Sequence, residues 1–128
     1  SATVVEAAGL PQPDTMQGRS LAPIATGDAD PDDHRDFVRC EYFDALDAQF
    51  TGAGGTFATM YRTRRYKLCN YHTQGLGELY DLQEDPWEFE DLWDSPDHAD
   101  IRHALVQASF DAQVLSSTDV GSRRIAPM

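Results

Sequence analysis

Four short strand-like segments in the middle of the chain constrain its fold more than any other sequence feature. Each is rich in aromatic and other β-compatible residues, bounded by turn-forming residues. The segments are Phe37–Phe43, Phe57–Arg62, Tyr66–His72 and Leu79–Leu82. The polar residues between the second and third segments predict a hairpin, and Gly52–Gly55 predicts a flexible turn before it. Four antiparallel strands with one apolar face need a helix to cover that face.

The sequence after Ser95 predicts that helix. Ser95 suits an N-cap and Pro96 suits the first helical position. Apolar residues then recur at helical spacing as a single stripe, which consists of Ile101, Leu105, Ala108, Ala112 and Leu115. The tail, residues 116–128, loses the pattern and is expected to be extended or loosely docked. The predicted fold is α+β: a small four-stranded antiparallel sheet packed by one C-terminal amphipathic helix, with an irregular N-terminal arm.

The residues before the sheet predict the end of a helix followed by that arm. Thr3–Ala8 favours a helix, and Gly9 followed by Pro11 is a strong stop signal. Because so short a helix is marginal in water, we expect its first turns to belong to a longer chain. Four of the seven prolines lie in Pro11–Asp33, a composition typical of an irregular connection. We therefore predict that residues 1–34 are a helix end plus an extended linker from another domain, and that residues 35–128 form an α+β subdomain.

Charge is segregated along the chain, which carries 22 acidic and 10 basic residues and a net charge of −12. A basic patch stands between two acidic stretches, Asp28–Asp47 and Glu78–Asp100. The patch consists of Arg62, Arg64, Arg65 and Lys67. It either docks against its own acidic flanks or faces an anion. The acidic balance disfavours a nucleic-acid partner, and no stretch is apolar enough to predict a membrane span.

No self-sufficient active site or metal site is predicted. Asp28–Asp32 imitates the start of a calcium loop, but Asp33 and Arg39 stand where that loop needs Gly and a bidentate Glu. Cys40 and Cys69 lie in strand segments beside apolar residues, which is typical of buried, inert thiols, and they could form one disulfide at most. We predict no catalytic residue, no metal ligand and no cofactor in this chain.

Three motifs nevertheless point to a family. Gly77–Leu92 resembles the signature "ELYDL..DP.E..NL" near the C-terminus of type I sulfatases, members of the alkaline phosphatase superfamily. Met60–Leu68 is similar to the family's "R-T-x-R-Y-K-L" hairpin, and Thr3–Leu21 to its "PTLLELAGLP…GxSLxP" segment. Three motifs in the right order are more specific than any one alone, and they cover most of residues 3–93. The resemblance implies the C-terminal subdomain of a sulfatase, packed on the catalytic domain of the same enzyme.

The resemblance also implies what the rest of such an enzyme does. Sulfatases hydrolyse sulfate esters with a formylglycine, matured from Cys or Ser in a C-x-P-S-R type motif, beside a calcium ion. Neither Cys40 nor Cys69 stands in such a motif, and in the family the nucleophile and the metal-binding carboxylates precede the segment that resembles this chain. The 128-residue chain is therefore expected to be inactive alone and, within the enzyme, to shape the rim of the substrate cleft. The N–H donors of arginine and histidine side chains suit an oxyanion. The candidates for contacting a sulfated substrate are therefore Arg62, Arg64, Arg65 and His72.

Two alternatives stay open at this point. The chain could be a free-standing acidic module that binds a basic protein through Asp28–Asp47 or Glu78–Asp100. The parent enzyme could instead hydrolyse phosphonate or phosphate esters, since the residues that would decide this lie outside the chain. A severed subdomain is expected to expose apolar surface and to self-associate through it.

Overall fold

The chain forms two compact units. The structure is a computed structural model that describes residues 1–14, 16–43 and 56–118. Residues 36–110 form one unit, and the first 35 residues group with the chain from Asp111 onward as the other. The turn predicted at Gly52–Gly55 lies outside the described residues. Within the described residues, no helix is both long and apolar enough to cross a membrane.

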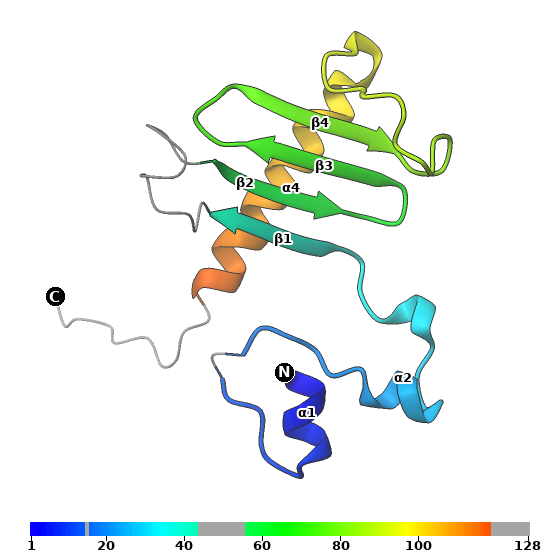
Figure 1. The fold of residues 1–128 in the computed structure, drawn as a ribbon, viewed down its shortest axis with the longest axis vertical. Helices are drawn as coiled ribbons and strands as arrows, with labels where there is room; N and C mark the ends of the chain where they lie inside the picture. Colours follow the sequence, from blue (N-terminus) through cyan, green and yellow to red (C-terminus); the bar gives the residue numbers. More distant parts are fainter. Residues whose placement is uncertain (15, 44–55, 119–128) are drawn as a thin grey trace, which may run out of the picture. The chain divides into compact units, whose positions relative to one another are not determined.

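Residues 36–110 contain the predicted sheet. Its four strands are antiparallel and follow one another in chain order (Figure 1). The strands are β1 (Val38–Phe43), β2 (Phe57–Arg62), β3 (Tyr66–Tyr71) and β4 (Leu76–Asp81). β4 begins three residues earlier than the sequence predicted. A tight turn precedes it, in which Thr73 and Gly75 adopt φ angles of 69° and 68°. That turn brings Leu76 opposite Tyr71 and so lengthens the ladder.

Strand register assigns each side chain to one of two faces. Leu68 of β3 stands opposite both Tyr61 of β2 and Leu79 of β4, so these three side chains share a face. Leu68 and Leu79 are only 1% and 0% exposed, which places the core on this covered face. The opposite face, here called the open face, carries the even-numbered residues of β1, β2 and β4 and the odd-numbered residues of β3.

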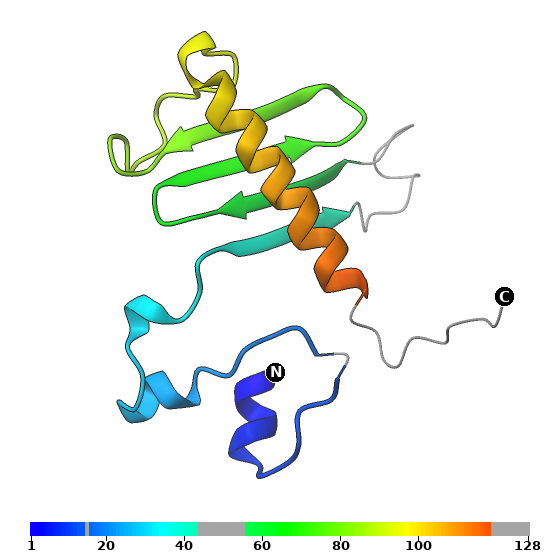
Figure 2. The same ribbon diagram turned by 180° about the vertical axis from the view of Figure 1, so that it is seen from behind.

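The long helix α4 (Ala99–Thr118) crosses the covered face, as Figure 2 shows. A 3₁₀ turn, Pro96–His98, leads into it and begins at the predicted cap, Ser95, whose hydroxyl contacts the His98 ring rather than a backbone N–H. Leu105 is buried, which confirms the centre of the predicted stripe. Leu115 is 71% exposed, so the buried stripe ends before it. The helix runs through Thr118 instead of ending at residue 115, and the remaining tail lies outside the described residues.

Trp93 joins the start of α4 to the sheet. A Cβ atom added to Gly77 of β4 would collide with the Trp93 ring, so only glycine lets the indole lie this close to the strand. The Arg102 side chain of α4 donates a hydrogen bond to the Trp93 carbonyl and lies 5.2 Å from the centre of its ring. The indole is therefore held between a strand backbone and a helix guanidinium.

The N-terminal unit begins with the predicted helix end. Helix α1 (Ala2–Ala7) stops before Gly9, whose φ of +68° is the left-handed conformation that glycine favours after a helix. The arm that follows is mostly irregular but includes a short helix, α2 (Ala22–Thr26), and a 3₁₀ turn at Pro31–Asp33. Five residues are too few to show a hydrophobic period, so α2 was not predictable from periodicity. The Thr3 hydroxyl accepts a hydrogen bond from the Leu21 N–H at 2.9 Å.

Candidate functional site

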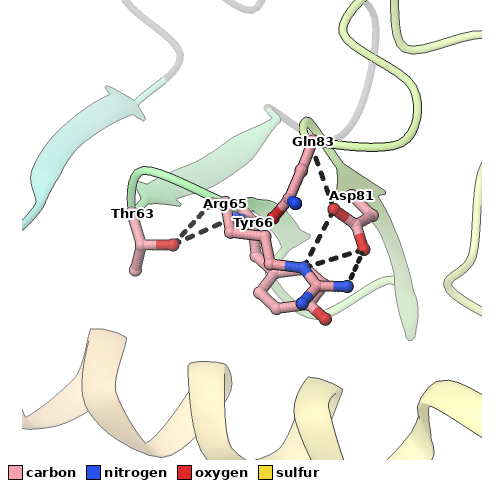
Figure 3. Close-up of polar contacts among 5 residues, drawn as sticks. All are labelled: Thr63, Arg65, Tyr66, Asp81 and Gln83. Carbon is pink, nitrogen blue, oxygen red and sulfur yellow. Dashed lines mark hydrogen bonds and ion pairs between the residues drawn. The ribbon is translucent and has the colours of Figure 1, made fainter.

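The candidate site lies around the tight turn between β2 and β3, where the basic patch is concentrated. Thr63 closes this turn with paired hydrogen bonds (Figure 3): its N–H donates to the Tyr66 carbonyl at 2.9 Å, and its hydroxyl accepts from the Tyr66 N–H at 2.9 Å. The Thr63 hydroxyl thus accepts the hydrogen bond that a backbone carbonyl would accept in a regular strand pair. The closed turn fixes Arg64 and Arg65 at its tip.

Arg65 binds Asp81 of β4 through a fork of hydrogen bonds (Figure 3). Its Nε lies 3.0 Å from Oδ2 and 3.2 Å from Oδ1, and its Nη2 lies 2.8 Å from Oδ2. Asp81 is only 5% exposed and also accepts the Gln83 N–H at 3.1 Å. The hydrogen bonds from Arg65, helped by that backbone N–H, lower the pKa of Asp81 despite its burial. The guanidinium donors of Arg65 are consequently directed to a carboxylate of the same chain.

Lys67 makes a second link of the same kind. Its Nζ lies 2.5 Å from a carboxylate oxygen of Glu88 and 5.6 Å from the centre of the Tyr80 ring. Glu88 has a φ of 60°, a conformation uncommon for residues other than glycine, and its N–H donates to the Asp85 carbonyl. Arg65 and Lys67 belong to the hairpin motif, while Asp81 and Glu88 belong to the downstream signature. Two ion pairs therefore fasten the two sequence motifs to each other.

Asp91 fastens the rest of the signature to the outer edge of β4. One carboxylate oxygen accepts the N–H of Leu79 at 3.0 Å and the N–H of Trp93 at 2.9 Å. The Leu92 N–H then donates to the Leu79 carbonyl at 2.8 Å. Both backbone groups that Leu79 turns outward are thereby satisfied, so the loop protects an edge that would otherwise be open to pairing.

A polar cluster lies on the open face beside the Lys67–Glu88 pair. Glu78 accepts hydrogen bonds from the Tyr71 hydroxyl at 2.7 Å and from the Tyr80 hydroxyl at 3.2 Å. Burial, reinforced by the negative charge of Glu78, raises the pKa of Tyr80 to about 12. The hydrogen bond to Glu78 is the main cause of the raised pKa of Tyr71. Both hydroxyls are therefore protonated donors at neutral pH.

The four candidate anion-binding residues do not converge on one point. Arg62 ends β2 and Arg64 occupies the following turn, both exposed, next to the engaged Arg65. His72 follows the last residue of β3, and its Nε2 lies 3.0 Å from the Thr59 hydroxyl. The length of β3, roughly 20 Å for six residues, separates His72 from the arginines. The arginines and the histidine could therefore meet only different parts of a ligand.

The cysteines and acids of the described residues do not fit a sulfatase cofactor site. Cys40 and Cys69 both stand opposite Met60, one on each side of β2, so two strand spacings separate them by roughly 9.5 Å. That separation exceeds the limit of about 7 Å for a disulfide, and both are free thiols. Burial, aided by Glu78, raises the pKa of Cys69, which disfavours the thiolate. Within residues 1–14, 16–43 and 56–118, no three His, Cys, Asp or Glu side chains are grouped to hold a metal ion.

The chain matches a known protein family over almost all of its length. The family described as N-sulphoglucosamine sulphohydrolase, C-terminal, matches residues 1–114. No curated protein sequence matches the chain.

Similar solved structures include sulfatases and a phosphonate monoester hydrolase. A protein of Bacteroides thetaiotaomicron assigned as a sulfatase is 29% identical, with a TM-score of 0.73 over 91% of this chain. A 2-O GAG sulfatase is 27% identical, with a TM-score of 0.75 over 97% of the chain. The phosphonate monoester hydrolase of Silicibacter pomeroyi is 26% identical, with a TM-score of 0.73 over 90% of the chain. The chain spans 24%, 26% and 24% of the length of these three proteins, in that order.

Proposed function

Since the chain belongs to the family of N-sulphoglucosamine sulphohydrolase C-terminal domains, we propose that the enzyme of which it is a part hydrolyses sulfate esters. The observation that carries this proposal is the family match over residues 1–114. Two of the similar solved structures are sulfatases, and both are about four times as long as this chain. Formylglycine and calcium would belong to the remainder of that enzyme, because the described residues of this chain provide no site for either.

Within that enzyme, we propose that residues 35–128 form the C-terminal subdomain and that residues 1–34 connect it to the catalytic domain. The C-terminal subdomain packs on the catalytic domain and takes no part in the chemical step. The two ion pairs, Arg65 with Asp81 and Lys67 with Glu88, support this role because they direct the motif residues to each other. The remaining candidates, Arg62, Arg64 and His72, are proposed to face the rim of the substrate cleft, with Arg64 foremost because it is exposed at the tip of the turn.

The alternative of a phosphonate monoester hydrolase has a specific observation in its favour. Such an enzyme matches 90% of this chain with a TM-score equal to that of the first sulfatase, and its identity is only slightly lower. The C-terminal domain therefore does not discriminate between the two chemistries. We favour the sulfatase because the family matched over residues 1–114 is a sulfatase family.

The test compares two substrates on the full-length enzyme expressed from the complete reading frame. An aryl sulfate and a phosphonate monoester with the same aryl leaving group are assayed under identical conditions. A higher kcat/KM for the sulfate is the expected result. A higher kcat/KM for the phosphonate would overturn the sulfatase assignment in favour of the related hydrolase.

A further inference from the structure

Among the described residues, no helix or strand covers the open face of the sheet, whereas α4 crosses the opposite face. In Figure 1 the open face is turned toward the viewer, and α4 passes behind the sheet. Large apolar side chains are exposed there, namely Val38 and Tyr42 of β1 and Leu76 of β4. Cys40 is exposed between the first two. These exposed apolar side chains lie on the two edge strands of the sheet, and exposed apolar patches on a protein surface often mark an interaction site.

Two exposed aromatic residues adjoin this face. Trp87 is 77% exposed and Phe89 is 86% exposed, the two highest values among the large hydrophobic residues described. They flank Glu88, whose carboxylate is bound to Lys67 on the open face. The ion pair therefore holds the tip of the signature loop, with both aromatic residues, beside the open face. Exposed aromatics adjoining an apolar face are typical of an interface.

The carboxylate at the centre of the open face has more hydrogen-bond acceptor positions than the contacts described within the chain fill. Glu78 accepts one hydroxyl on each carboxylate oxygen, and a carboxylate has about four acceptor positions. A partner that buries Glu78 must therefore bring N–H groups or a cation to it, because an incompletely paired buried carboxylate is destabilising. The surface of a partner that fits the open face is therefore apolar, with a hydrogen-bond donor or a positive group near its centre.

The similar solved proteins are much longer than this chain, which favours a partner within the same enzyme. The chain spans 24–26% of the similar proteins, so about three quarters of such a protein lies outside it. Helix α4 already crosses the covered face, whereas no described helix or strand lies over the open face (Figures 1 and 2). We propose that the open face, extended by Trp87 and Phe89, is the surface that docks on the catalytic domain of the same enzyme. This inference rests on the proposed function.

Cys40 provides a direct test, because it is exposed on the open face and its labelling reports access to that face. Maleimide labelling of the native full-length protein is followed by mass spectrometry, with Ala104→Cys on an exposed position of α4 as the reference thiol. Cys40 is expected to react roughly tenfold or more slowly than the reference, because thiol reaction needs access. Equal rates would overturn the inference. Protection of Cys40 that disappears on dilution would also overturn it, in favour of a second copy as the occupant.

A second measurement uses matched aromatic substitutions in the full-length protein. Trp87→Asp is expected to lower the melting temperature by about 3 °C or more, because it places a charge in the interface. Phe110→Asp is the control, since Phe110 is also exposed but lies on α4, and it is expected to have a much smaller effect. Equal shifts for the two variants would contradict the docking surface.

Activity measured on the same preparation separates this inference from the proposed function. If the protein hydrolyses sulfate esters while Cys40 reacts as fast as the reference thiol, the docking surface is wrong and the proposed function stands. If Cys40 is protected in a protein that cleaves no sulfate ester, the docking surface stands and the sulfatase assignment fails.

Discussion

Asp81 is the residue on which the two central sequence motifs converge. Its carboxylate binds the Arg65 guanidinium, accepts a backbone N–H from Gln83 and lies almost wholly out of solvent. A buried carboxylate is tolerated only when its acceptors are paired, so Arg65 is needed where it stands. The sequence left open whether Arg65 docks against acids of its own chain or faces a separate anion. The anion it binds is an acid of its own chain.

Replacing Asp81 tests that role. Asp81→Asn is expected to lower the free energy of unfolding at pH 7 by about 1.5 kcal/mol, a modest value because Arg65 is half-exposed. Since the folded state lowers the pKa of Asp81 below 3.8, its contribution is complete at neutral pH. It is lost as the pH falls from about 4 through the lowered pKa, so wild type and variant should converge in acid. Denaturant unfolding at pH 7 and over a series of pH values below 4 measures both, with Glu90→Gln in the same loop as the neutral control.

Arg64 is the residue at which a role toward substrate can be separated from a structural one. In the full-length enzyme, Arg64→Ala is expected to raise KM for a sulfate ester about three- to tenfold with little change in kcat. Arg65→Ala should instead lower the melting temperature, because Asp81 loses its partner. Steady-state kinetics and a thermal melt on the same samples distinguish the two effects. An unchanged KM for Arg64→Ala would remove this residue from the substrate rim.

At the scale of elements, the sheet and the helix could be predicted from the sequence. The side-chain contacts that hold them together could not. β2 runs over its predicted residues because aromatic content and flanking turns define it locally. The start of β4 was missed because Gly77 interrupts the apolar pattern, and only Trp93, sixteen residues away, explains that glycine. The Lys67–Glu88 pair likewise joins residues 21 positions apart. Local patterns predict elements, but contacts between distant residues depend on strand register and loop path.

Gly77 offers a test of the strand–loop–helix contact. Gly77→Ala is expected to destabilise the chain by about 2 kcal/mol, because the added methyl group forces the Trp93 ring off the strand. Gly18→Ala is the matched control, since a Cβ there would meet only Ala2 at an ordinary 3.7 Å. Denaturant unfolding followed by tryptophan fluorescence compares the variants. Equal stability of the two would show that Trp93 is not packed against Gly77.

At the scale of the whole molecule, the acidic surface has a structural explanation. Glu78–Asp100 contains ten acids and no lysine or arginine, the feature that favoured an acidic interaction module. At least five of the ten make contacts within the chain: Glu78, Asp81, Asp85, Glu88 and Asp91. This stretch therefore compensates the basic patch and closes the edge of β4. The other stretch, Asp28–Asp47, extends beyond the described residues.

The family could be predicted from the sequence because its motifs are the residues that hold the subdomain together. Arg65, Lys67, Asp81, Glu88 and Asp91 all make the contacts that fix the hairpin and the signature loop. The substrate could not be predicted in the same way, since none of the three sequence motifs distinguishes one ester from another. The residues that identify the family are therefore scaffold residues.

Hydrolysis of an aryl sulfate by the purified 128-residue chain, measured beside the full-length enzyme in calcium-containing buffer, tests the central claim most directly. We predict turnover by the full-length enzyme and none above background by the 128-residue chain. Sulfate release by the 14.2 kDa chain alone would contradict it.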